Sequence, residues 1–241
     1  NNLGNAFRDL RQLDRAVQSY ERALNLNPDY PTLHNNLGIA FKELGQFDKA
    51  VECYKKAIAI NPDYPDSHNN LGVALLELGQ LDNAVQSYEE ALAINPDYAE
   101  AYNNLGTALK GLGKRNEAIS SYEKALAINP DYAEAHNNIG NVFKKLGRVE
   151  DALESYEKAL AINPDDADTL NNLGNAFTKL ERMDEAVQSY EKVLAINPDY
   201  ADVYTNLGLA FLKLDRLDDA YKSNEKALAL NPDSAEGYSI Q

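Results

Sequence analysis

The chain has 241 residues and a formal net charge of −15 at pH 7. Apolar residues make up 44% of it and charged residues 25%, which is ordinary for a soluble folded protein. The excess of negative charge disfavours binding to nucleic acid or to an anionic membrane, because both need clustered Lys and Arg.

One pattern of 34 residues repeats along the whole chain, marked by Gly, Ala and Pro. The markers are Gly4, Gly38, Gly72, Gly106, Gly140, Gly174 and Gly208; Ala16, Ala50, Ala84, Ala118, Ala152, Ala186 and Ala220; and Pro28, Pro62, Pro96, Pro130, Pro164, Pro198 and Pro232. In chain order they predict an incomplete repeat at 1–30, full repeats at 31–64, 65–98, 99–132, 133–166, 167–200 and 201–234, and the start of a further helix at 235–241. No linker interrupts the series, so we expect a single array over residues 1–241.

Each repeat is predicted to hold two helices, as repeat 99–132 illustrates. Asp97 to Glu100 has the pattern of a capping box at the start of the first helix, and Gly113 suits the left-handed turn after it. Gly106 and Ala118 are expected to let the two helices approach closely. The apolar positions that follow helical spacing are Leu105, Ala108, Leu109 and Leu112, then Ala118, Ile119, Tyr122, Ala125, Leu126 and Ile128. The predicted fold is all-α, a solenoid of antiparallel helix–turn–helix repeats whose neighbours bury a continuous core.

The pattern resembles the tetratricopeptide repeat (TPR) over essentially the whole chain. The matching positions in one repeat are Leu37, Gly38, Phe41, Ala50, Tyr54, Ala57 and Pro62. The resemblance implies a right-handed superhelix whose concave face is lined by the first helix of each repeat. Four departures, at Glu181, Val193, Asp215 and Asn224, predict altered packing in the last two full repeats.

A column of asparagines in the first helix has no packing explanation. One site is Asn in seven copies, at Asn2, Asn36, Asn70, Asn104, Asn138, Asn172 and Asn206, and a second Asn precedes it in six, at Asn1, Asn35, Asn69, Asn103, Asn137 and Asn171. Asn is a mediocre helix former, about 0.5 kcal/mol worse than Ala, so the column needs a reason. Its amide can pair with a peptide backbone whatever the side chains of the ligand are. The sequence therefore predicts a peptide-binding groove that uses Asn35, Asn36, Asn69, Asn70, Asn103, Asn104, Asn137, Asn138, Asn171, Asn172 and Asn206.

The column is similar to the asparagine ladder of the O-linked N-acetylglucosamine transferase family, which implies capture of a polypeptide by its backbone. Two other interpretations stay open: each Asn bonds to its own or a neighbouring helix, or the copies are recent duplicates. The Lys-rich carboxylate clamp of chaperone adaptors is not expected, because its first Lys site is Asn in six repeats and its second is Asp, Glu or Thr.

Two charged columns accompany the asparagines. Acidic residues or Thr stand in the first turn of the first helix, at Thr32, Asp66, Glu100, Glu134, Asp168, Asp202 and Glu236. Basic residues stand near its end, at Arg8, Lys42, Lys110, Lys144, Lys145, Lys179 and Lys213. They complement the helix dipole, and an alternative is a groove with one acidic and one basic edge that orients a mixed-charge ligand.

The remaining reactive residue types favour packing over chemistry. His34, His68 and His136 share one position of the repeat and are too far apart to form a metal site. Cys53 stands where other repeats carry Ser, and it has no partner for a disulfide. The turn tyrosines Tyr30, Tyr64, Tyr98, Tyr132 and Tyr200 are expected to pack between repeats. We therefore expect no enzyme, no metal and no cofactor.

Three functional hypotheses follow. The first is a scaffold for protein–protein interaction that binds an extended peptide through the Asn column. The second is the substrate-recruiting arm of a larger enzyme such as a glycosyltransferase, since the chain starts at Asn1 and looks like a piece of a longer protein. The third is an array that self-associates head to tail. The expected partner is a protein or peptide, without nucleic acid or membrane insertion, and a cytoplasmic location is favoured because no signal peptide is visible.

Overall fold

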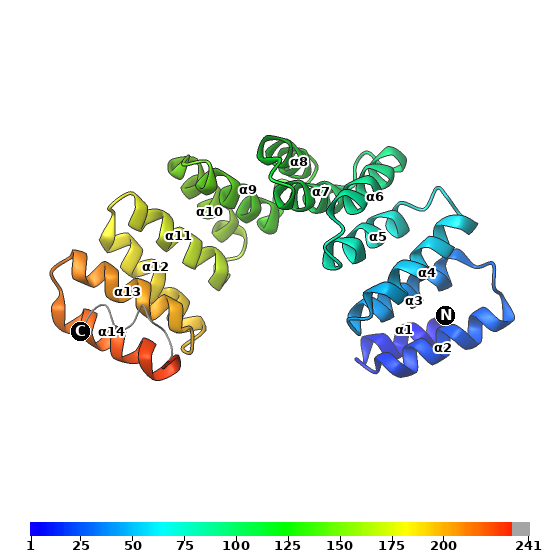
Figure 1. Ribbon diagram of the computed structural model, residues 1–241, viewed down its shortest axis with the longest axis horizontal. Coiled ribbons are helices and arrows are strands. Elements are labelled where there is room, and N and C mark those ends of the chain that lie inside the picture. The colour runs from blue at the N-terminus through cyan, green and yellow to red at the C-terminus, as the bar shows by residue number, and fades with distance from the viewer. Residues whose placement is uncertain (233–241) are drawn as a thin grey trace. The chain divides into compact units, whose positions relative to one another are not determined.

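The computed structural model describes residues 1–232, which form fourteen α-helices and no β-strand (Figure 1). The helices are α1 (Asn2–Asp9), α2 (Leu13–Leu26), α3 (Pro31–Glu43), α4 (Phe47–Ile60), α5 (Pro65–Glu77), α6 (Leu81–Ile94), α7 (Ala99–Gly111), α8 (Arg115–Ile128), α9 (Ala133–Lys145), α10 (Val149–Ile162), α11 (Ala167–Lys179), α12 (Met183–Ile196), α13 (Ala201–Lys213) and α14 (Leu217–Leu230). The predicted all-α repeat fold is confirmed. The helices divide into an N-terminal unit, residues 1–129, and a C-terminal unit that begins at residue 130, and each is described by itself.

Consecutive helices pair into hairpins, one for each repeat of the sequence (Figure 1). Within the N-terminal unit, α2 also packs on α3, α4 on α5 and α6 on α7, and within the C-terminal unit α10 packs on α11 and α12 on α13. Odd-numbered helices of neighbouring hairpins contact each other as well: α3 and α5, α5 and α7, α9 and α11, α11 and α13. The odd-numbered helices of each unit therefore form a layer, called the odd-helix layer below.

A glycine in each odd helix makes room for an aromatic ring from the following even helix. A Cβ atom added to Gly106 would lie 2.6 Å from Cε1 of Tyr122, which is completely buried. The same relation joins Gly4 to Tyr20, Gly38 to Tyr54, Gly72 to Tyr88, Gly140 to Tyr156 and Gly174 to Tyr190. The sequence predicts that Gly106 and Ala118 let the helices approach closely, and the structure adds that the space at Gly106 is filled by the ring of Tyr122.

The turn between the two helices of a hairpin uses a residue with positive φ. Glycines fill it at Gly45, Gly79, Gly113 and Gly147, with φ of 70° to 79°. Arg11, Glu181 and Asp215 take φ of 58° to 59° at the same place, so these repeats keep the turn at the expense of a strained backbone.

Of the other late departures, Asn224 changes one packing contact. It replaces the buried tyrosine of the earlier repeats, and its Oδ1 atom has no hydrogen-bond partner within residues 1–232. The nearest atom to a Cβ on Gly208 is then the carbonyl oxygen of Ala220, at 3.4 Å. Val193 remains completely buried, so the expected alteration of packing is confined to the ring that is missing.

The capping box predicted at Asp97 to Glu100 is wrong. The N-cap of α7 is Tyr98, whose side chain makes no capping bond. The backbone N–H of Asp97 donates instead to Oδ1 of Asn95, at 3.2 Å, because an Asn side chain closes a turn two residues ahead of itself. Among the described N-cap residues only Asp166 accepts a hydrogen bond with its side chain, from the first turn of α11.

Candidate functional site

The asparagine column forms a hydrogen-bonded relay between neighbouring repeats. The second Asn of one repeat donates from Nδ2 to Oδ1 of the first Asn of the preceding repeat. The described pairs are Asn36 to Asn1 (2.8 Å), Asn70 to Asn35 (3.2 Å), Asn104 to Asn69 (3.1 Å) and Asn172 to Asn137 (3.2 Å). The interpretation that each Asn bonds to a neighbouring helix therefore accounts for one N–H of the second Asn and for the carbonyl of the first.

The two asparagines of a pair differ in their access to solvent. Asn35, Asn69 and Asn103 are buried in the N-terminal unit, with at most 4% of their surface exposed, so they lie too deep to contact a ligand directly. The second Asn of each pair, at Asn36, Asn70 and Asn104, is half-buried in the odd-helix layer. In the N-terminal unit the second Asn of each pair is therefore the one that a ligand can reach. In the C-terminal unit both asparagines of the pairs at Asn137 and Asn171 are half-buried.

The buried first asparagines are held by several partners. Asn69 donates from Nδ2 to Oε1 of Glu100 (3.2 Å) and to the hydroxyl of Tyr98 (3.4 Å). Oδ1 of Asn35 accepts from Oγ of Ser67 at 3.1 Å. Glu100, expected to cap its own helix, thus binds the preceding repeat. Burial, followed by the carboxylates of Glu100 and Asp66, raises the pKa of Tyr98 above its ordinary value, so its hydroxyl stays protonated.

The second asparagines keep a free acceptor. Within residues 1–232 no group donates to Oδ1 of Asn36, Asn70 or Asn104, although each has one N–H engaged in the relay. A half-exposed amide oxygen held in a fixed direction can accept from a peptide N–H. The relay therefore orients the column as well as holding the stack together.

The relay changes in the C-terminal unit. Nζ of Lys144 donates to Oδ1 of Asn172 at 2.8 Å, so a lysine occupies the acceptor that is free in the N-terminal unit. Asn206 donates to Oδ1 of Asn175 at 3.3 Å, and the buried Oδ1 of Asn171 is left without a partner in the described part of the chain. Among residues 1–232 the carbonyl of the second Asn is thus unused at Asn36, Asn70 and Asn104 and occupied at Asn172.

A second position in the odd-helix layer determines whether the hydroxyl of the buried tyrosine in the same repeat has a hydrogen-bond partner. It lies three residues after the second Asn. Polar residues there bond the tyrosine hydroxyl: Asn5 with Tyr20 (2.6 Å), Thr107 with Tyr122 (3.2 Å), Asn141 with Tyr156 (2.9 Å) and Asn175 with Tyr190 (2.8 Å). Ile39 and Val73 stand there in the other two repeats that carry the tyrosine, and the hydroxyls of Tyr54 and Tyr88 are buried without a partner among residues 1–232. Sequence reasoning missed this pairing, although the alternation of polar and apolar residues is visible in the repeats.

The charged columns lie where the sequence placed them. The acids Asp66, Glu100, Glu134, Asp168 and Asp202 stand in the first turns of α5, α7, α9, α11 and α13, while Glu236 lies outside the described residues. The basic column is in fact two positions. Arg8, Lys42, Lys110 and Lys144 are half-buried, whereas Lys145, Lys179 and Lys213, one residue further along the repeat, are exposed.

The histidines form hydrogen bonds to the turn between repeats. Nε2 of each contacts the carbonyl oxygen of the Asn-Pro-Asp proline six residues earlier: His34 with Pro28 (2.8 Å), His68 with Pro62 (2.8 Å) and His136 with Pro130 (2.9 Å). The carbonyl can only accept, so Nε2 carries the hydrogen. No group of His, Cys, Asp and Glu suited to a metal ion occurs in residues 1–232.

Cys53 and four of the five turn tyrosines are buried or half-buried, and the expected packing of Tyr30 is not found. Cys53 is buried, and burial raises the pKa of its thiol to about 11, which leaves little thiolate to react. The tyrosines Tyr64, Tyr98, Tyr132 and Tyr200 are half-buried beside the N-termini of odd helices, while Tyr30 is exposed.

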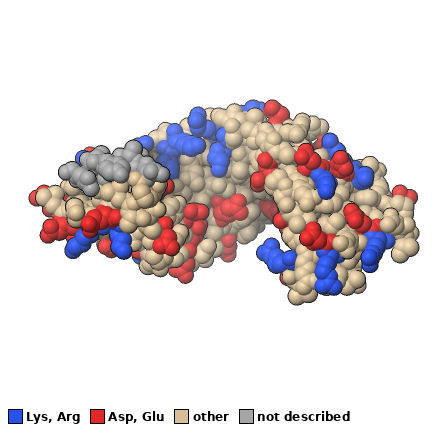
Figure 2. Space-filling model, turned by 60° about the horizontal axis from the view of Figure 1, so that its bottom comes forward, with Lys and Arg blue, Asp and Glu red and all other residues tan. Residues whose placement is uncertain are grey.

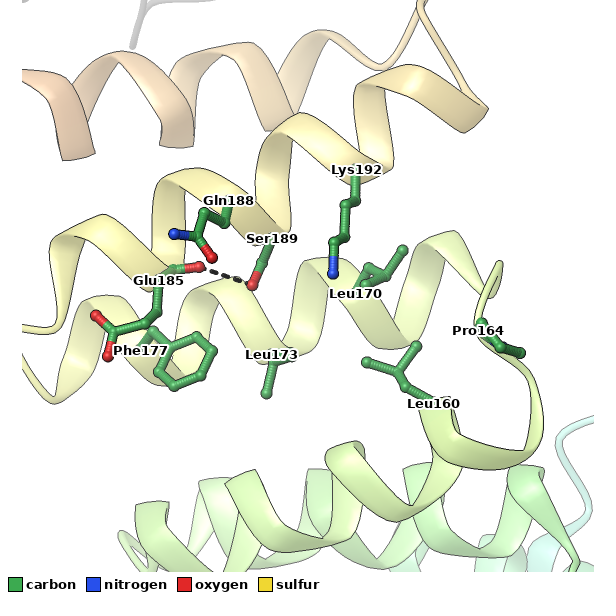
Figure 3. A pocket seen from close by; sticks show the side chains of 9 residues that line it. All are labelled: Leu160, Pro164, Leu170, Leu173, Phe177, Glu185, Gln188, Ser189 and Lys192. Atoms are coloured by element: carbon green, nitrogen blue, oxygen red, sulfur yellow. Dashed lines mark hydrogen bonds between the residues drawn. The ribbon is translucent and has the colours of Figure 1, made fainter.

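A small pocket of about 250 Å³ lies on the seam between α10, α11 and α12 (Figure 3). Leu170, Leu173 and Phe177 of α11 form its apolar floor, and Lys192 of α12 reaches over it. Ser189, whose hydroxyl donates to the backbone carbonyl of Glu185 at 2.8 Å, closes one side. The corresponding seam beside α5 and α6 forms a similar pocket, so this is a feature of hairpin packing that recurs with the repeat.

Family profiles match almost the whole chain. Profiles described as TPR repeat match residues 4–45, 40–79, 74–113, 111–147, 140–181 and 174–215, and a profile described as tetratricopeptide repeat matches residues 201–234. No curated protein matches the sequence. None of the helices in residues 1–232 combines the length and the apolar character that crossing a bilayer requires.

Solved structures with the same architecture include YrrB, described as a TPR protein with an unusual peptide-binding site. It is 24% identical, with a TM-score of 0.67 over 78% of this chain and 97% of that one. The pilF protein of Pseudomonas aeruginosa is 22% identical, with a TM-score of 0.79 over 88% of this chain and 96% of that one. MamA is 28% identical, with a TM-score of 0.61 over 71% and 94%. At the identities of YrrB and pilF the likeness shows the fold alone.

Proposed function

The chain belongs to the tetratricopeptide repeat family, and on that premise we propose that it binds an extended peptide segment of a partner protein along its odd-helix layer. The second Asn of each repeat contacts the peptide backbone. The buried first Asn is a positioning residue that holds its neighbour. Proteins of this repeat family generally mediate protein–protein interaction, and YrrB is one that has a peptide-binding site.

The single observation that carries the proposal is the unused carbonyl of Asn36, Asn70 and Asn104. Each lies at the solvent boundary while the same side chain is fixed from behind by a hydrogen bond of 2.8 to 3.2 Å. Pre-fixed groups lose less side-chain entropy on binding than free ones do. Each hydrogen bond to a ligand N–H contributes about 0.5–1.5 kcal/mol, so several in a row are needed for useful affinity. The repeated column supplies them without reading the ligand sequence.

The test uses the tightest binder from an array of fluorescent peptides of mixed sequence. Replacing Asn70 and Asn104 by Ala removes two ligand acceptors and should weaken binding of every peptide by a similar factor. Methylating the backbone nitrogens of the peptide should weaken binding to the wild-type protein and have less effect on the variant. The control replaces the exposed asparagines Asn83 and Asn116 of the even helices by Ala. Fluorescence anisotropy measures binding, and circular dichroism reports whether the fold is retained.

Equal affinity of the folded Asn70→Ala, Asn104→Ala variant and the control would contradict the proposal. The recruiting arm of an enzyme, the head-to-tail array and the cytoplasmic location stay predictions. The coding sequence beyond residue 241, sedimentation at high concentration and microscopy of the tagged full-length protein would test them in that order.

A further inference from the structure

The last residue of the odd helices is mostly acidic in the N-terminal unit and basic in the C-terminal unit. In chain order, the residue at this position is Asp9, Glu43, Glu77, Gly111, Lys145, Lys179 and Lys213, and all are exposed. Lys at a helix C-terminus is favoured by the helix dipole, but Asp and Glu there are disfavoured. The dipole therefore does not explain the acids of α1, α3 and α5. The position varies with its place in the array, as a position that selects a ligand would.

The three lysines at this position form no internal ion pair in the described part of the chain. Within residues 1–232, Lys145, Lys179 and Lys213 have no carboxylate in salt-bridge range, in a chain whose net charge is −15. Lys144 adds a fourth charge beside them: burial first, then repulsion from Lys145 and Lys179, lowers its pKa. Figure 2 shows one dense group of Lys and Arg on the face that it presents, whereas blue and red mix elsewhere. An anionic ligand is the natural complement of such unpaired lysines.

A pocket of mixed polar and apolar lining contains two of these lysines. It has a volume of about 710 Å³ and is lined by Leu209, Leu212 and Met183 together with Lys179 and Lys213, with Thr178 and Glu181 completing the rim. Leu209 and Leu212 are 46% and 36% exposed on α13. The preceding repeat carries the polar residues Asn175 and Thr178 at their positions. The pocket thus places apolar side chains directly beside cationic ones, a combination that suits an apolar side chain flanked by carboxylates.

We infer that the C-terminal ends of α9, α11 and α13 bind an acidic segment of a partner polypeptide, with one apolar side chain seated against Leu209 and Leu212 and its Asp or Glu neighbours against Lys145, Lys179 and Lys213. The inference rests on the proposed peptide-binding function and specifies the class of peptide for the C-terminal unit. The Asn column recognises the backbone, and this surface selects the side chains. The acids at the same position of the N-terminal unit would repel such a segment.

The experiment compares three fluorescent peptides on the full chain: an acidic peptide with a central Leu, the same peptide with Gly in place of Leu, and a basic peptide with the central Leu. The test variant combines Lys145→Glu, Lys179→Glu and Lys213→Glu, which installs the residue that Glu43 and Glu77 already supply. The matched control reverses the same number of charges in the same repeats, on even helices, by Lys158→Glu, Lys192→Glu and Lys226→Glu; these lysines are also exposed, and Glu90 already occupies that position in another repeat.

The acidic Leu peptide should bind saturably, and the odd-helix variant should weaken it by about tenfold or more, while the even-helix control changes it much less. Replacing Leu209 by Asn and Leu212 by Thr should remove the preference for Leu over Gly and leave the salt dependence intact. Equal weakening by both triple variants, equal binding of the acidic and basic peptides, or no saturable binding up to millimolar concentration would overturn the inference.

Two further measurements distinguish an acidic peptide from other anionic ligands, and the lysine surface from the Asn column. Tight binding of single-stranded RNA or of anionic lipid vesicles that the odd-helix variant abolishes, without binding of the acidic peptide, would also overturn it. If replacing Asn70 and Asn104 abolishes binding of all peptides and the odd-helix variant has no effect, this inference is refuted and the proposed function stands. The reverse outcome would refute the Asn column and keep the lysine surface.

Discussion

Replacing Tyr88 by Phe should stabilise the protein, although the same change at Tyr156 should destabilise it. Both side chains are completely buried. The hydroxyl of Tyr88 has no partner in residues 1–232, whereas that of Tyr156 donates to Oδ1 of Asn141 at 2.9 Å. Phe keeps the ring carbons that pack on the glycine of the facing helix, so the substitution changes the hydroxyl and leaves the packing nearly intact.

The two changes in stability differ in sign because the hydroxyl of Tyr88 has no hydrogen-bond partner in residues 1–232 and that of Tyr156 has one. A buried hydroxyl without a partner costs about 1–3 kcal/mol, so its removal from Tyr88 should gain about 1 kcal/mol after the loss of some contact. At Tyr156 the loss of one hydrogen bond costs about 0.5–1.5 kcal/mol, and half-buried Asn141 can recover part of it from water. The two variants should therefore differ by about 2 kcal/mol. Val73→Thr should also stabilise by about 1 kcal/mol, because Thr107 supplies the equivalent hydroxyl to Tyr122 in the next repeat.

A double-mutant cycle isolates the hydroxyl contact. Val73→Thr should stabilise the wild-type protein and have no effect in the Tyr88→Phe background, which gives a coupling energy of about 1 kcal/mol. Repeat arrays can lose two-state behaviour, so amide hydrogen exchange within α5–α6 and α9–α10 is a better measure than a single global midpoint. A coupling energy of zero, or an equal loss of stability in Tyr88→Phe and Tyr156→Phe, would refute the reasoning.

Three other predictions concern packing and reactivity. Gly106→Ala should destabilise by about 1–3 kcal/mol through overlap with the tyrosine ring. Gly208→Ala should stabilise by up to about 1 kcal/mol, because the atoms nearest to its added Cβ, the carbonyl oxygen of Ala220 at 3.4 Å and Cβ of Ser223 at 3.6 Å, are at ordinary van der Waals distance. Urea unfolding that ranks the two variants in the opposite order would be inconsistent with these contacts. Glu181→Gly should stabilise by about 0.5–1 kcal/mol, since Gly relieves a φ of 59°, and an unchanged thermal midpoint would speak against stored strain there. Cys53, whose thiol pKa burial raises to about 11, should react with a thiol reagent near neutral pH only as fast as the protein opens, and labelling as fast as in urea would contradict this.

The fold could be predicted from the sequence because every repeat carries the same pattern of packing residues. A single Gly or Tyr is weak evidence, but seven glycines and six tyrosines at an interval of 34 leave one arrangement that buries them. Glu181 and Asp215 keep the left-handed backbone of the turn although they are not Gly, because the two packed helices on either side of each turn impose it.

Contacts between side chains of different repeats could not be predicted in the same way. Asp97 to Glu100 matches a capping pattern, yet Glu100 bonds Asn69 of the preceding repeat, because an inter-repeat partner competes with the local one. The Asn relay depends in turn on which face of α3, α5 and α7 meets the next helix. Spacing along one repeat does not contain that information, so the sequence predicts Asn35, Asn69 and Asn103 as ligand-binding residues although the stack buries them.

The recurrence of a residue in a repeat protein is therefore weaker evidence for binding than it first suggests. The first Asn recurs in six copies, and the buried carbonyls of Asn35 and Asn69 are already used by the relay. The second Asn recurs in seven and is only partly explained, because its carbonyl stays free in the N-terminal unit and is taken by Lys144 at Asn172. Positions that the stack does not constrain are the ones that change, as the last residue of the odd helices does from Glu43 to Lys179. A position that is exposed, variable and coherent in charge within each unit is where ligand choice can evolve without loss of the fold. Specificity in this chain should accordingly reside in its variable positions, and the recurrent asparagines should supply affinity that is common to all ligands.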